Sequence, residues 1–400
     1  MERIGIYGGA FNPPHLGHIR AAQCAVEALD LSQLLMIPSC VSPHKLLPEN
    51  APTPQQRLQM LQLALTDREK IQASDLELQR GGTSYTFETV DEVTRLYPGA
   101  ERILFMGTDM FTSFLTWRHP EKILEKASVA VFYRGEKGEK EAIHDQKVAL
   151  EAMGAKVYVV ENPVTEISST DLRRMLVFRC ASPFLAPQTE NFLREQGLYG
   201  TAKDYRGLPM EELEQVVVGL LKPNRVAHVL GCRDTAAQLA RIWGADETAA
   251  ARAGLLHDIT KALDGPLQLT LCREYGIILD DFSSHNPKTL HALTGSLVAE
   301  RIFGERETVV QAIRSHTTGK ANMNLLEKII YVADYMEPNR DFPGVENLRA
   351  LAYTDLDAAL RLGLEMTLEM LRSQGREISP ESQEALQYLK DTSKNSPFAI

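Results

Sequence analysis

The hydrophobic pattern of this 400-residue chain changes once, near residue 201. Before this point, short apolar runs that are typical of strands alternate with amphipathic segments of helical period. Five such runs occur, over residues 3–7, 34–38, 102–106, 128–133 and 156–160. After it, the strand-like runs disappear and segments of helical period follow one another. The pattern predicts two domains, an N-terminal α/β domain with a largely parallel sheet and a C-terminal all-α domain.

The chain length supports this division, because 400 residues exceed what one hydrophobic core usually organises. Residues 201–207 combine glycines with polar side chains between the two patterns and are the expected linker. We therefore expect a first domain over residues 1–200, a second domain over 208–392 and a flexible polar tail over 393–400.

Composition and charge narrow the expected partners. A formal net charge of −10 disfavours broad binding to nucleic acid or to an anionic membrane, so small molecules are the expected partners. The first residues read as a strand and a glycine turn rather than a signal peptide, and no apolar run is long enough to span a bilayer. The five cysteines lie far apart without a CxxC spacing, which is typical of a reducing cytoplasm. The sequence leaves a homo-oligomer open.

The string GGAFNPPHLGH, residues 8–18, follows a predicted strand and opens a predicted helix. Glycines at such a place let the backbone approach phosphates closely, and the first N–H groups of a helix attract anions. His15 and His18 lie three positions apart, and their imidazole N–H groups can bind triphosphate oxygens as pyrophosphate leaves. Phosphoryl-type transfer needs alignment and charge neutralisation rather than a covalent nucleophile.

This string resembles, position for position, the GGxFxPPHxGH signature of the nicotinate mononucleotide adenylyltransferases, a branch of the HxGH nucleotidyltransferase family. The resemblance continues almost to residue 200 through 43–45, 84–89, 107–109, Trp117, Arg134 and 167–173. It implies a Rossmann-like domain that condenses ATP, bound with Mg²⁺, and nicotinate mononucleotide into nicotinate adenine dinucleotide and pyrophosphate.

The resemblance also implies residue roles. The catalytic residues would be His15, His18, Lys45 and Arg173, with Lys45 and Arg173 meeting phosphate. The substrate-binding residues would be Gly8, Gly9, Ala10, Phe11, Thr86, Gly107, Asp109, Trp117, Arg134, Ser168, Ser169 and Thr170. Among them, the two glycines and the string 168–170 would hold ATP. The pyridine nucleotide would lie against Thr86, Asp109, Trp117 and Arg134, with the indole stacked on the nicotinate ring.

Each of these residues has a plainer interpretation. Two adjacent glycines alone indicate a tight turn, Trp117 alone indicates core packing, and 168–170 alone indicates a helix cap. Lys45 and Arg134 alone would be solvated surface charges. Two other HxGH reactions, pantetheine phosphate adenylylation and glycerol phosphate cytidylylation, remain alternatives, although Trp117 and the strings 107–109 and 168–173 favour the nicotinate branch.

The helical half carries a second set of polar residues, distributed over five segments of helical pattern or their ends. Its members are His228, His257, Asp258, His291, His316 and Asp334. Their flanks are apolar, which points the polar groups inward. One such histidine is more often a satisfied core residue. Several buried imidazoles and carboxylates together are costly unless they are paired or bind a cation, so the set predicts a metal centre in the core of a helical bundle.

The set resembles the H…HD…H…H…D pattern of HD-domain phosphohydrolases, and the strings LLHDITK, HTTG and ADYMEPNRDF resemble the subgroup that cleaves diadenosine tetraphosphate symmetrically into two ADP. All six residues would then be metal ligands for two divalent ions, iron or manganese. Asp258 would bridge the two ions and be catalytic. His228, His257 and Asp334 would complete one site, and His291 and His316 the other. Thr317 stands where other branches often place a histidine.

Lys261 would lie on the same helical face as Asp258 and act on phosphate, or else be a surface lysine, and Arg340 is a similar case. A metal-bound but inactive regulatory or dimerisation module is an alternative for the second domain. Guanosine tetraphosphate hydrolysis is a further alternative, which the HTTG and ADYMEP strings disfavour.

Overall fold

The computed structural model describes residues 2–41, 51–133, 138–162 and 167–394. The chain divides into two compact units, Met1–Lys203 and Asp204–Ile400. Lys45 and Arg134 lie outside the described residues.

The first unit contains a six-stranded parallel sheet in the order β3-β2-β1-β4-β5-β6. The strands are β1 (Arg3–Gly9), β2 (Gln33–Pro38), β3 (Ile71–Ala73), β4 (Glu101–Gly107), β5 (Ser128–Tyr133) and β6 (Val157–Glu161). The prediction of an α/β domain with a parallel sheet is confirmed. The sequence interpretation missed β3, because three residues are too few to show a strand period.

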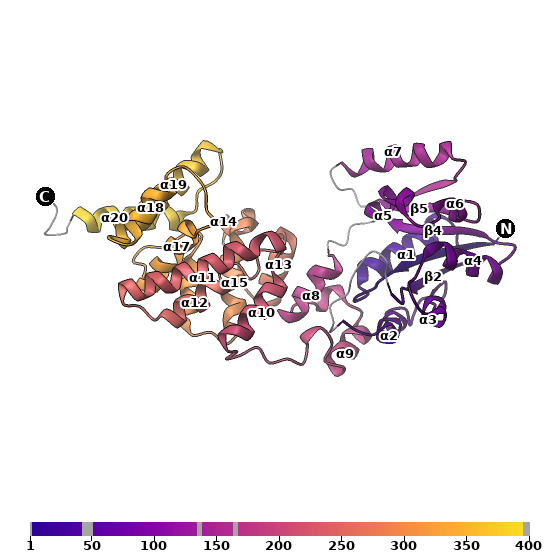
Figure 1. The fold of residues 1–400 in the computed structure, drawn as a ribbon, viewed down its shortest axis with the longest axis horizontal. Coiled ribbons are helices and arrows are strands. Elements are labelled where there is room, and N and C mark those ends of the chain that lie inside the picture. The colour runs from indigo at the N-terminus through magenta and orange to yellow at the C-terminus, as the bar shows by residue number, and fades with distance from the viewer. Residues whose placement is uncertain (1, 42–50, 134–137, 163–166, 395–400) are drawn as a thin grey trace. The chain divides into compact units, whose positions relative to one another are not determined.

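Helices cover both faces of this sheet (Figure 1). The helices of this unit are α1 (Leu16–Ala28), α2 (Pro54–Ala64), α3 (Leu76–Arg80), α4 (Thr86–Leu96), α5 (Thr108–Thr112), α6 (Pro120–Leu124), α7 (Glu139–Ala152), α8 (Ser169–Val177) and α9 (Pro187–Glu195), with 3-10 turns η1 (Phe114–Thr116), η2 (Ser182–Phe184) and η3 (Leu198–Gly200). Along β2, Leu35 and Ile37 enter one hydrophobic cluster while Leu34 and Met36 enter the other. The strands are therefore apolar on both faces, as a doubly covered parallel sheet requires.

The order of the strands reverses between β1 and β4, because β2 and β3 follow β1 toward one edge of the sheet while β5 and β6 follow β4 toward the other. Tyr7 of β1 pairs with Phe105 of β4, so the two strands end at the same edge. Ligands of open α/β sheets bind in the crevice beyond the carboxyl ends of the strands at such a reversal. The fold thus directs attention to the segments that follow Gly9 and Gly107.

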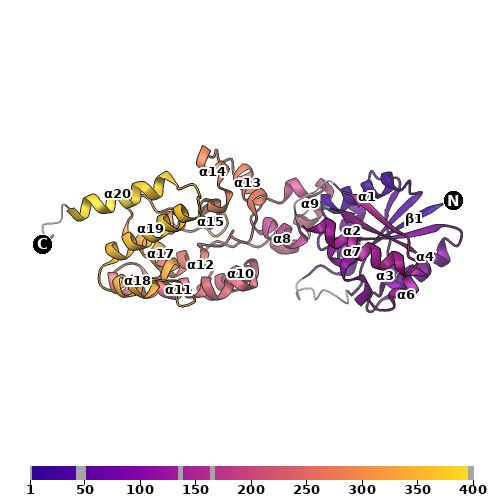
Figure 2. The same cartoon turned by 90° about the horizontal axis from the view of Figure 1, so that it is seen from above.

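Throughout its described residues, the second unit is helical, which confirms the all-α prediction. Its helices are α10 (Met210–Leu220), α11 (Pro223–Trp243), α12 (Glu247–Leu256), α13 (Gly265–Glu274), α14 (Asp281–His285), α15 (Leu290–Arg301), α16 (Glu307–Ser315), α17 (Leu325–Met336), α18 (Val345–Ala352), α19 (Leu356–Ser373) and α20 (Pro380–Lys394), with the 3-10 turn η4 (Pro287–Thr289). α11 packs against α12 and α17 (Figures 1 and 2). α16 packs against α12, α15 and α17.

Part of the expected linker is buried, and the last helix extends into the expected tail. Within the expected linker, Tyr205 is buried in the second unit and its ring lies 5.9 Å from that of Phe303. α20 runs to Lys394, two residues into the expected tail, and the rest of that tail lies outside the described residues. No helix in the described part of the chain is long and apolar enough to cross a membrane.

Candidate active sites

In the first unit, Gly8 and Gly9 form the carboxyl end of β1, and Gly107 forms that of the neighbouring β4. A Cβ atom placed on Gly8 would meet no atom within 4 Å, so the backbone there faces open space. A Cβ atom on Gly9 would lie 3.2 Å from the ring of Phe11, which is buried beneath the turn. The glycine turn thus leaves its backbone accessible to a ligand at the point where the strand order reverses.

His15 and His18 begin α1 with their rings together. The ring centroids are 3.6 Å apart and the planes are inclined by 33°. The backbone N–H of His15, the N-cap residue, donates to Nδ1 of His18 at 3.2 Å. Because Nδ1 of His18 accepts this bond, the neutral ring carries its proton on Nε2. The local hydrogen bond therefore selects the tautomer that makes Nε2 of His18 a donor.

The string 168–173 meets this turn through α8. The Ser168 hydroxyl accepts from the N–H of Asp171 at 3.0 Å, so the cap interpretation of this string holds. The Ser169 hydroxyl donates to the carbonyl of Pro13 at 3.3 Å. Arg173 donates to the carbonyl of Asn12 at 2.8 Å. The amino end of α8 is thus brought onto the loop that contains His15, although more than 150 positions separate the bonded pairs.

The sequence interpretation missed Arg57, which is fully buried. Its guanidinium donates to the carbonyl oxygens of Ala10 at 2.7 Å, of Ser39 at 2.5 Å and of Cys40 at 3.2 Å. Burial lowers the pKa of Arg57. This side chain ties the loop after β1 to the end of β2. It lies within a predicted helix as an ordinary polar residue, so the sequence contains no signal for its role.

The residues expected at the pyridine nucleotide lie on separate elements. Thr86 is the first residue of α4, and Asp109 lies in α5 directly after the end of β4. Trp117 follows η1 and is half-buried, with its ring 5.3 Å from that of Phe114 at the edge of a hydrophobic cluster. The structure therefore supports core packing for part of the Trp117 side chain.

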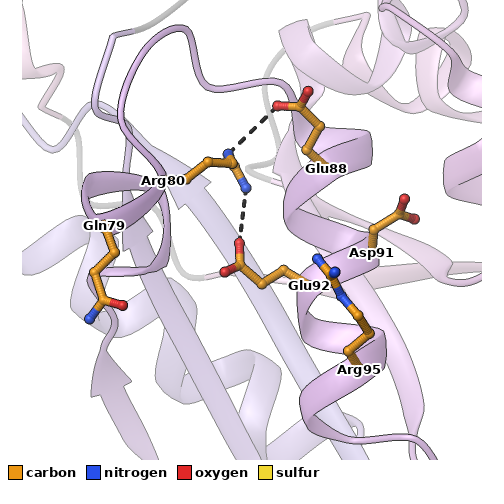
Figure 3. Close-up of a pocket in the computed structure, with 6 residues that line it drawn as sticks. All are labelled: Gln79, Arg80, Glu88, Asp91, Glu92 and Arg95. Carbon is orange, nitrogen blue, oxygen red and sulfur yellow. Dashed lines mark hydrogen bonds and ion pairs between the residues drawn. The ribbon is translucent and has the colours of Figure 1, made fainter.

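A hollow of about 500 Å³ lies between α3 and α4 of the first unit (Figure 3). Its lining residues are Gln79, Arg80, Glu88, Asp91, Glu92 and Arg95. Arg80 pairs with Glu92 at 3.1 Å and with Glu88 at 3.6 Å. None of the residues expected at the adenylyltransferase site lines it.

In the second unit, the structure brings together all six residues that the sequence indicated as metal ligands. They come from α11, from the turn after α12, from α15, from the end of α16 and from α17. His257 and Asp258 are at most 1% exposed, and the Asp334 side chain is 16% exposed. The helices therefore place the six polar groups at one place in the bundle.

The six residues form two overlapping groups. In the first, Nε2 of His228 lies 3.1 Å from Oδ1 of Asp334 and 3.2 Å from Nε2 of His257. In the second, Oδ1 of Asp258 lies 3.4 Å from Nε2 of His291 and 3.8 Å from Nε2 of His316. Donor atoms of His228, His257 and Asp334 all lie within 4.8 Å of one another, as do those of His257, Asp258 and His316.

Hydrogen bonds at the outer nitrogen atoms orient all four imidazoles. The acceptors at Nδ1 are the carbonyl of Gly254 for His257 at 2.7 Å, of Lys288 for His291 at 2.8 Å, of Ile313 for His316 at 2.6 Å, and Oε1 of Glu337 for His228 at 3.0 Å. Because these groups only accept, each Nδ1 carries a proton and each neutral ring turns the lone pair of Nε2 inward.

This donor set fits a divalent cation. Two lone pairs 3.2 Å apart, as in His228 and His257, cannot bond each other, but a cation near both can accept them. Oδ1 of Asp258 is buried and makes no hydrogen bond to the described residues. Burial lowers the pKa of His257 to about 4, so this ring is neutral at pH 7. The set thus contains the nitrogen and oxygen ligands that transition metals prefer.

Three cationic side chains border the six residues. Arg225, on α11, donates to Oδ2 of Asp258 at 2.6 Å, and Arg340 donates to Oδ1 of Asp334 at 2.6 Å. Lys261 lies 2.9 Å from Nε2 of His291. The sequence interpretation missed Arg225, although its position three residues before His228 on one helix was a usable signal.

The prediction that Lys261 lies on a helical face with Asp258 is wrong. α12 ends at Leu256, and both residues lie in the turn that follows. The turn is tightened by i to i+3 hydrogen bonds, such as the one from the N–H of Lys261 to the carbonyl of Asp258 at 2.9 Å.

The hydroxyl of Thr317 lies 3.1 Å from Nε2 of both His291 and His316.

Two family models match the chain. The cytidylyltransferase-like model covers residues 6–175, and the HD domain model covers residues 225–339. A Halalkalibacterium halodurans protein named "Bis(5'-nucleosyl)-tetraphosphatase, symmetrical" is 43% identical over 169 residues, which are 42% of this chain and 90% of the relative. A Dictyoglomus thermophilum protein named "Probable nicotinate-nucleotide adenylyltransferase" is 31% identical over 198 residues, which are 49% of this chain and 99% of the relative.

A solved structure from Clostridium acetobutylicum, described as a "predicted HD superfamily hydrolase involved in NAD metabolism", is 38% identical. It covers 46% of this chain and 98% of its own, with a TM-score of 0.45. Each relative thus spans less than half of this chain, while this chain spans nearly all of each relative. The chain therefore belongs to the cytidylyltransferase-like family through its first unit and to the HD domain family through its second.

Proposed function

We propose that the first unit transfers the adenylyl group of ATP to nicotinate mononucleotide, with Mg²⁺ accompanying the ATP. The supporting observation is the meeting of the Gly8–His18 loop with the amino end of α8 beside the reversal of the strand order. Two histidines, an arginine and the first N–H groups of two helices there offer hydrogen-bond donors and positive potential to a triphosphate. The named relative of Dictyoglomus thermophilum agrees with this assignment.

In this reaction a phosphate oxygen of nicotinate mononucleotide forms a bond to the α-phosphorus of ATP. The bond from that phosphorus to the bridging oxygen of the β-phosphate breaks, and pyrophosphate leaves with the bonding electron pair. His15, His18, Arg173 and Lys45 would neutralise the charge that develops on the leaving group. The backbone at Gly8, Gly9, Ala10 and Phe11 and the string 168–170 would hold ATP.

The same proposal assigns the second substrate to the segment after β4. Gly107 and Asp109 would contact the pyridine nucleotide, together with Thr86 at the start of α4. The half-buried indole of Trp117 would stack on the nicotinate ring, and Arg134 would lie near the phosphate of this nucleotide.

A substrate panel tests this assignment. The full chain is incubated with Mg²⁺ and ATP together with nicotinate mononucleotide, nicotinamide mononucleotide or pantetheine phosphate, and separately with CTP and glycerol phosphate. We expect nicotinate adenine dinucleotide and an equal amount of pyrophosphate as the main products. Transfer to pantetheine phosphate or glycerol phosphate instead would replace the proposed reaction by another of the same family.

For the second unit, we propose symmetrical hydrolysis of diadenosine tetraphosphate with two divalent metal ions, iron or manganese. The observation that supports it is the convergence of four Nε2 lone pairs on two carboxylates, the buried Asp258 and the partly buried Asp334. The ligands would be His228, His257 and Asp334 for one ion and His291 and His316 for the other, with Asp258 between them. Such a pair of ions would polarise the phosphate oxygens and lower the pKa of an attacking water.

In the hydrolysis, the oxygen of water bonds to the second phosphorus of the chain, and the bridge between the second and third phosphorus breaks. One proton of the water passes to the departing phosphate oxygen, and two ADP result. Lys261, Arg225 and Arg340 border the ligand set and would bind the non-bridging oxygens of the polyphosphate.

The test supplies metal-free full chain with Mn²⁺, Fe²⁺ or Mg²⁺ and with dinucleoside polyphosphates of different length or guanosine tetraphosphate. We expect ADP as the sole product from diadenosine tetraphosphate. Formation of ATP and AMP would contradict symmetrical cleavage. Binding of metal without turnover of any of these nucleotides would favour a regulatory module.

A further inference from the structure

One histidine of the HD unit is held differently from the other three. The Nδ1 atoms of His257, His291 and His316 each bond a backbone carbonyl three residues earlier, a contact that local helical geometry supplies. Nδ1 of His228 instead lies 3.0 Å from Oε1 of Glu337, 109 positions later in the chain. His228 is thus the one imidazole of this set whose orientation depends on an acidic side chain from a different helix.

Glu337 itself is held firmly. The residue caps the end of α17 and is 1% exposed. Its Oε2 accepts from the backbone N–H of Asn339 at 2.7 Å and from Nδ2 of the same residue at 2.8 Å. Nδ2 of Asn339 also donates to the carbonyl of Ala227 at 3.0 Å, which ties the turn after α17 to α11. The carboxylate therefore has both oxygens engaged.

α11 leaves room for this carboxylate. Gly231 lies three residues after His228 on the same face of the helix, and a Cβ atom there would stand 2.4 Å from Oε2 of Glu337. Any larger residue at this position would displace the carboxylate. His228 and Gly231 thus form the part of the α11 surface against which the carboxylate of Glu337 packs.

The buried carboxylate of Glu337 requires a compensating positive charge. A buried carboxylate is unfavourable unless a positive group compensates it. Among the described residues, His228 is the one basic side chain that pairs with Glu337 within 4.0 Å. A cation at Nε2 of His228 would draw electron density through the ring and strengthen the bond from Nδ1–H to the carboxylate.

We infer that Glu337 is a positioning residue that orients His228 as a metal ligand and raises its basicity. This inference rests on the metal centre of the proposed function. It also predicts an asymmetry: the ion at His228, His257 and Asp334 depends on Glu337, whereas the ion at His291 and His316 does not.

The test variant is Glu337→Gln. A glutamine has one acceptor oxygen, so it can serve either Nδ1–H of His228 or the donors of Asn339, but not both. The matched control is Glu327→Gln, on the same helix. Glu327 is also 1% exposed, and it bonds the N–H of Asn324 at 2.8 Å and pairs with Lys320 at 2.6 Å. Glu327→Gln removes a buried charge from α17 and Glu337→Gln removes one from its C-cap, but only Glu337→Gln touches a ligand.

Metal-free full chains are titrated with Co²⁺ and with Mn²⁺ by calorimetry, and the visible spectrum of bound Co²⁺ is recorded. We expect wild type to bind two ions. Glu337→Gln should bind one of them about 10- to 100-fold more weakly and change its spectrum. Glu327→Gln should match wild type. Gly231→Ala, which keeps Glu337 but displaces it, should reproduce the loss and serves if Glu337→Gln does not fold.

Two results would overturn the inference while leaving the metal centre intact. They are wild-type affinity for both ions in Glu337→Gln and in Gly231→Ala, and an equal loss of affinity in Glu327→Gln. If wild type itself binds no ion, the proposed metal centre fails, and the inference fails with it.

Discussion

The guanidinium of Arg173 donates a hydrogen bond of 2.8 Å to the backbone carbonyl of Asn12, 161 positions earlier in the chain. Its second terminal nitrogen donates to the hydroxyl of Thr170 at 3.0 Å. On its other side, Asn12 accepts a bond at Oδ1 from the hydroxyl of Tyr199. One arginine therefore connects the amino end of α8 with the loop that precedes His15.

Replacement of Arg173 by alanine should lower both the free energy of unfolding of the first unit and its rate of adenylyl transfer. The variant leaves the carbonyl of the buried residue Asn12 without this donor, and hydrogen bonds of charged groups contribute about 1.5 to 3 kcal/mol. We expect the free energy of unfolding of the first unit to fall by about this amount in urea. The measurement is the fluorescence of Trp117 in a Trp243→Phe background. Arg194→Ala removes an exposed arginine that bonds only Glu190 among the described residues, and supplies the control.

His18 allows a sharper separation of structure from chemistry. In His18→Asn, the side-chain oxygen can still accept from the N–H of His15, as Nδ1 of His18 does, but no group replaces Nε2. We expect His18→Asn and His18→Ala to lower kcat by about 100-fold or more, since one charge-stabilising donor commonly contributes about 3 kcal/mol. Only His18→Ala should also destabilise α1. Wild-type turnover by His18→Asn would remove Nε2 from the reaction.

Much of the fold could be predicted because the hydrophobic period of each strand and helix is visible within a short stretch of sequence. Runs such as 102–106 and 128–133 alternate with helical segments, and they became β4 and β5. The six HD residues could be found because each stands in an apolar helical segment, where a buried polar group is unfavourable unless it is paired or binds a cation. The residues that could not be found act across long separations. Arg57 looks like an ordinary polar residue of a helix and Glu337 like an ordinary polar residue at a helix end, and their partners are set by tertiary packing.

The two units should be separable. Lys203 and Asp204 mark the division between them, and each unit has its own buried core. We expect residues 1–203 and 204–400, expressed separately, to be soluble and to unfold cooperatively, each with its own activity. Insolubility of both fragments together with recovery on co-expression would show that each unit requires the other.

Glu77 should make the stability of the first unit depend on pH. The residue is 6% exposed and accepts from the Thr89 hydroxyl at 2.6 Å, and its burial raises the pKa of the carboxyl group. A raised native pKa means that the folded state binds the proton more tightly than the unfolded state. The stabilising effect is full below the unfolded value of about 4.3 and is lost as pH rises through the native pKa.

Glu77→Gln keeps the acceptor for Thr89 and removes the charge. The unfolding free energy of this variant, relative to wild type, should therefore increase as pH rises from 4 to 8. Urea unfolding curves at successive pH values measure it, with the exposed Glu69→Gln as the comparison. A constant difference between Glu77→Gln and wild type over this range would contradict the expectation.

The HD unit offers a paired test of ligand and phosphate roles. Asp258 has one carboxylate oxygen within 4 Å of His291 and His316 and the other within 4 Å of His228 and His257, so Asp258→Ala should lose metal and hydrolysis together. The ammonium group of Lys261 lies 2.9 Å from Nε2 of His291. A cation that binds to this nitrogen must displace the ammonium group. Lys261→Ala should therefore keep its metal.

Once displaced from His291, the Lys261 ammonium is available to a phosphate oxygen. We expect Lys261→Ala to raise the KM for diadenosine tetraphosphate by about 10- to 100-fold, as the loss of one charged hydrogen bond of about 1.5 to 3 kcal/mol implies. Metal analysis and initial rates measure the two effects, and adenylyl transfer should be unchanged in both variants. Full hydrolysis by a metal-free Asp258→Ala protein would exclude metal-assisted cleavage. Loss of metal in Lys261→Ala would make this lysine a support of the ligand set rather than a phosphate-binding residue.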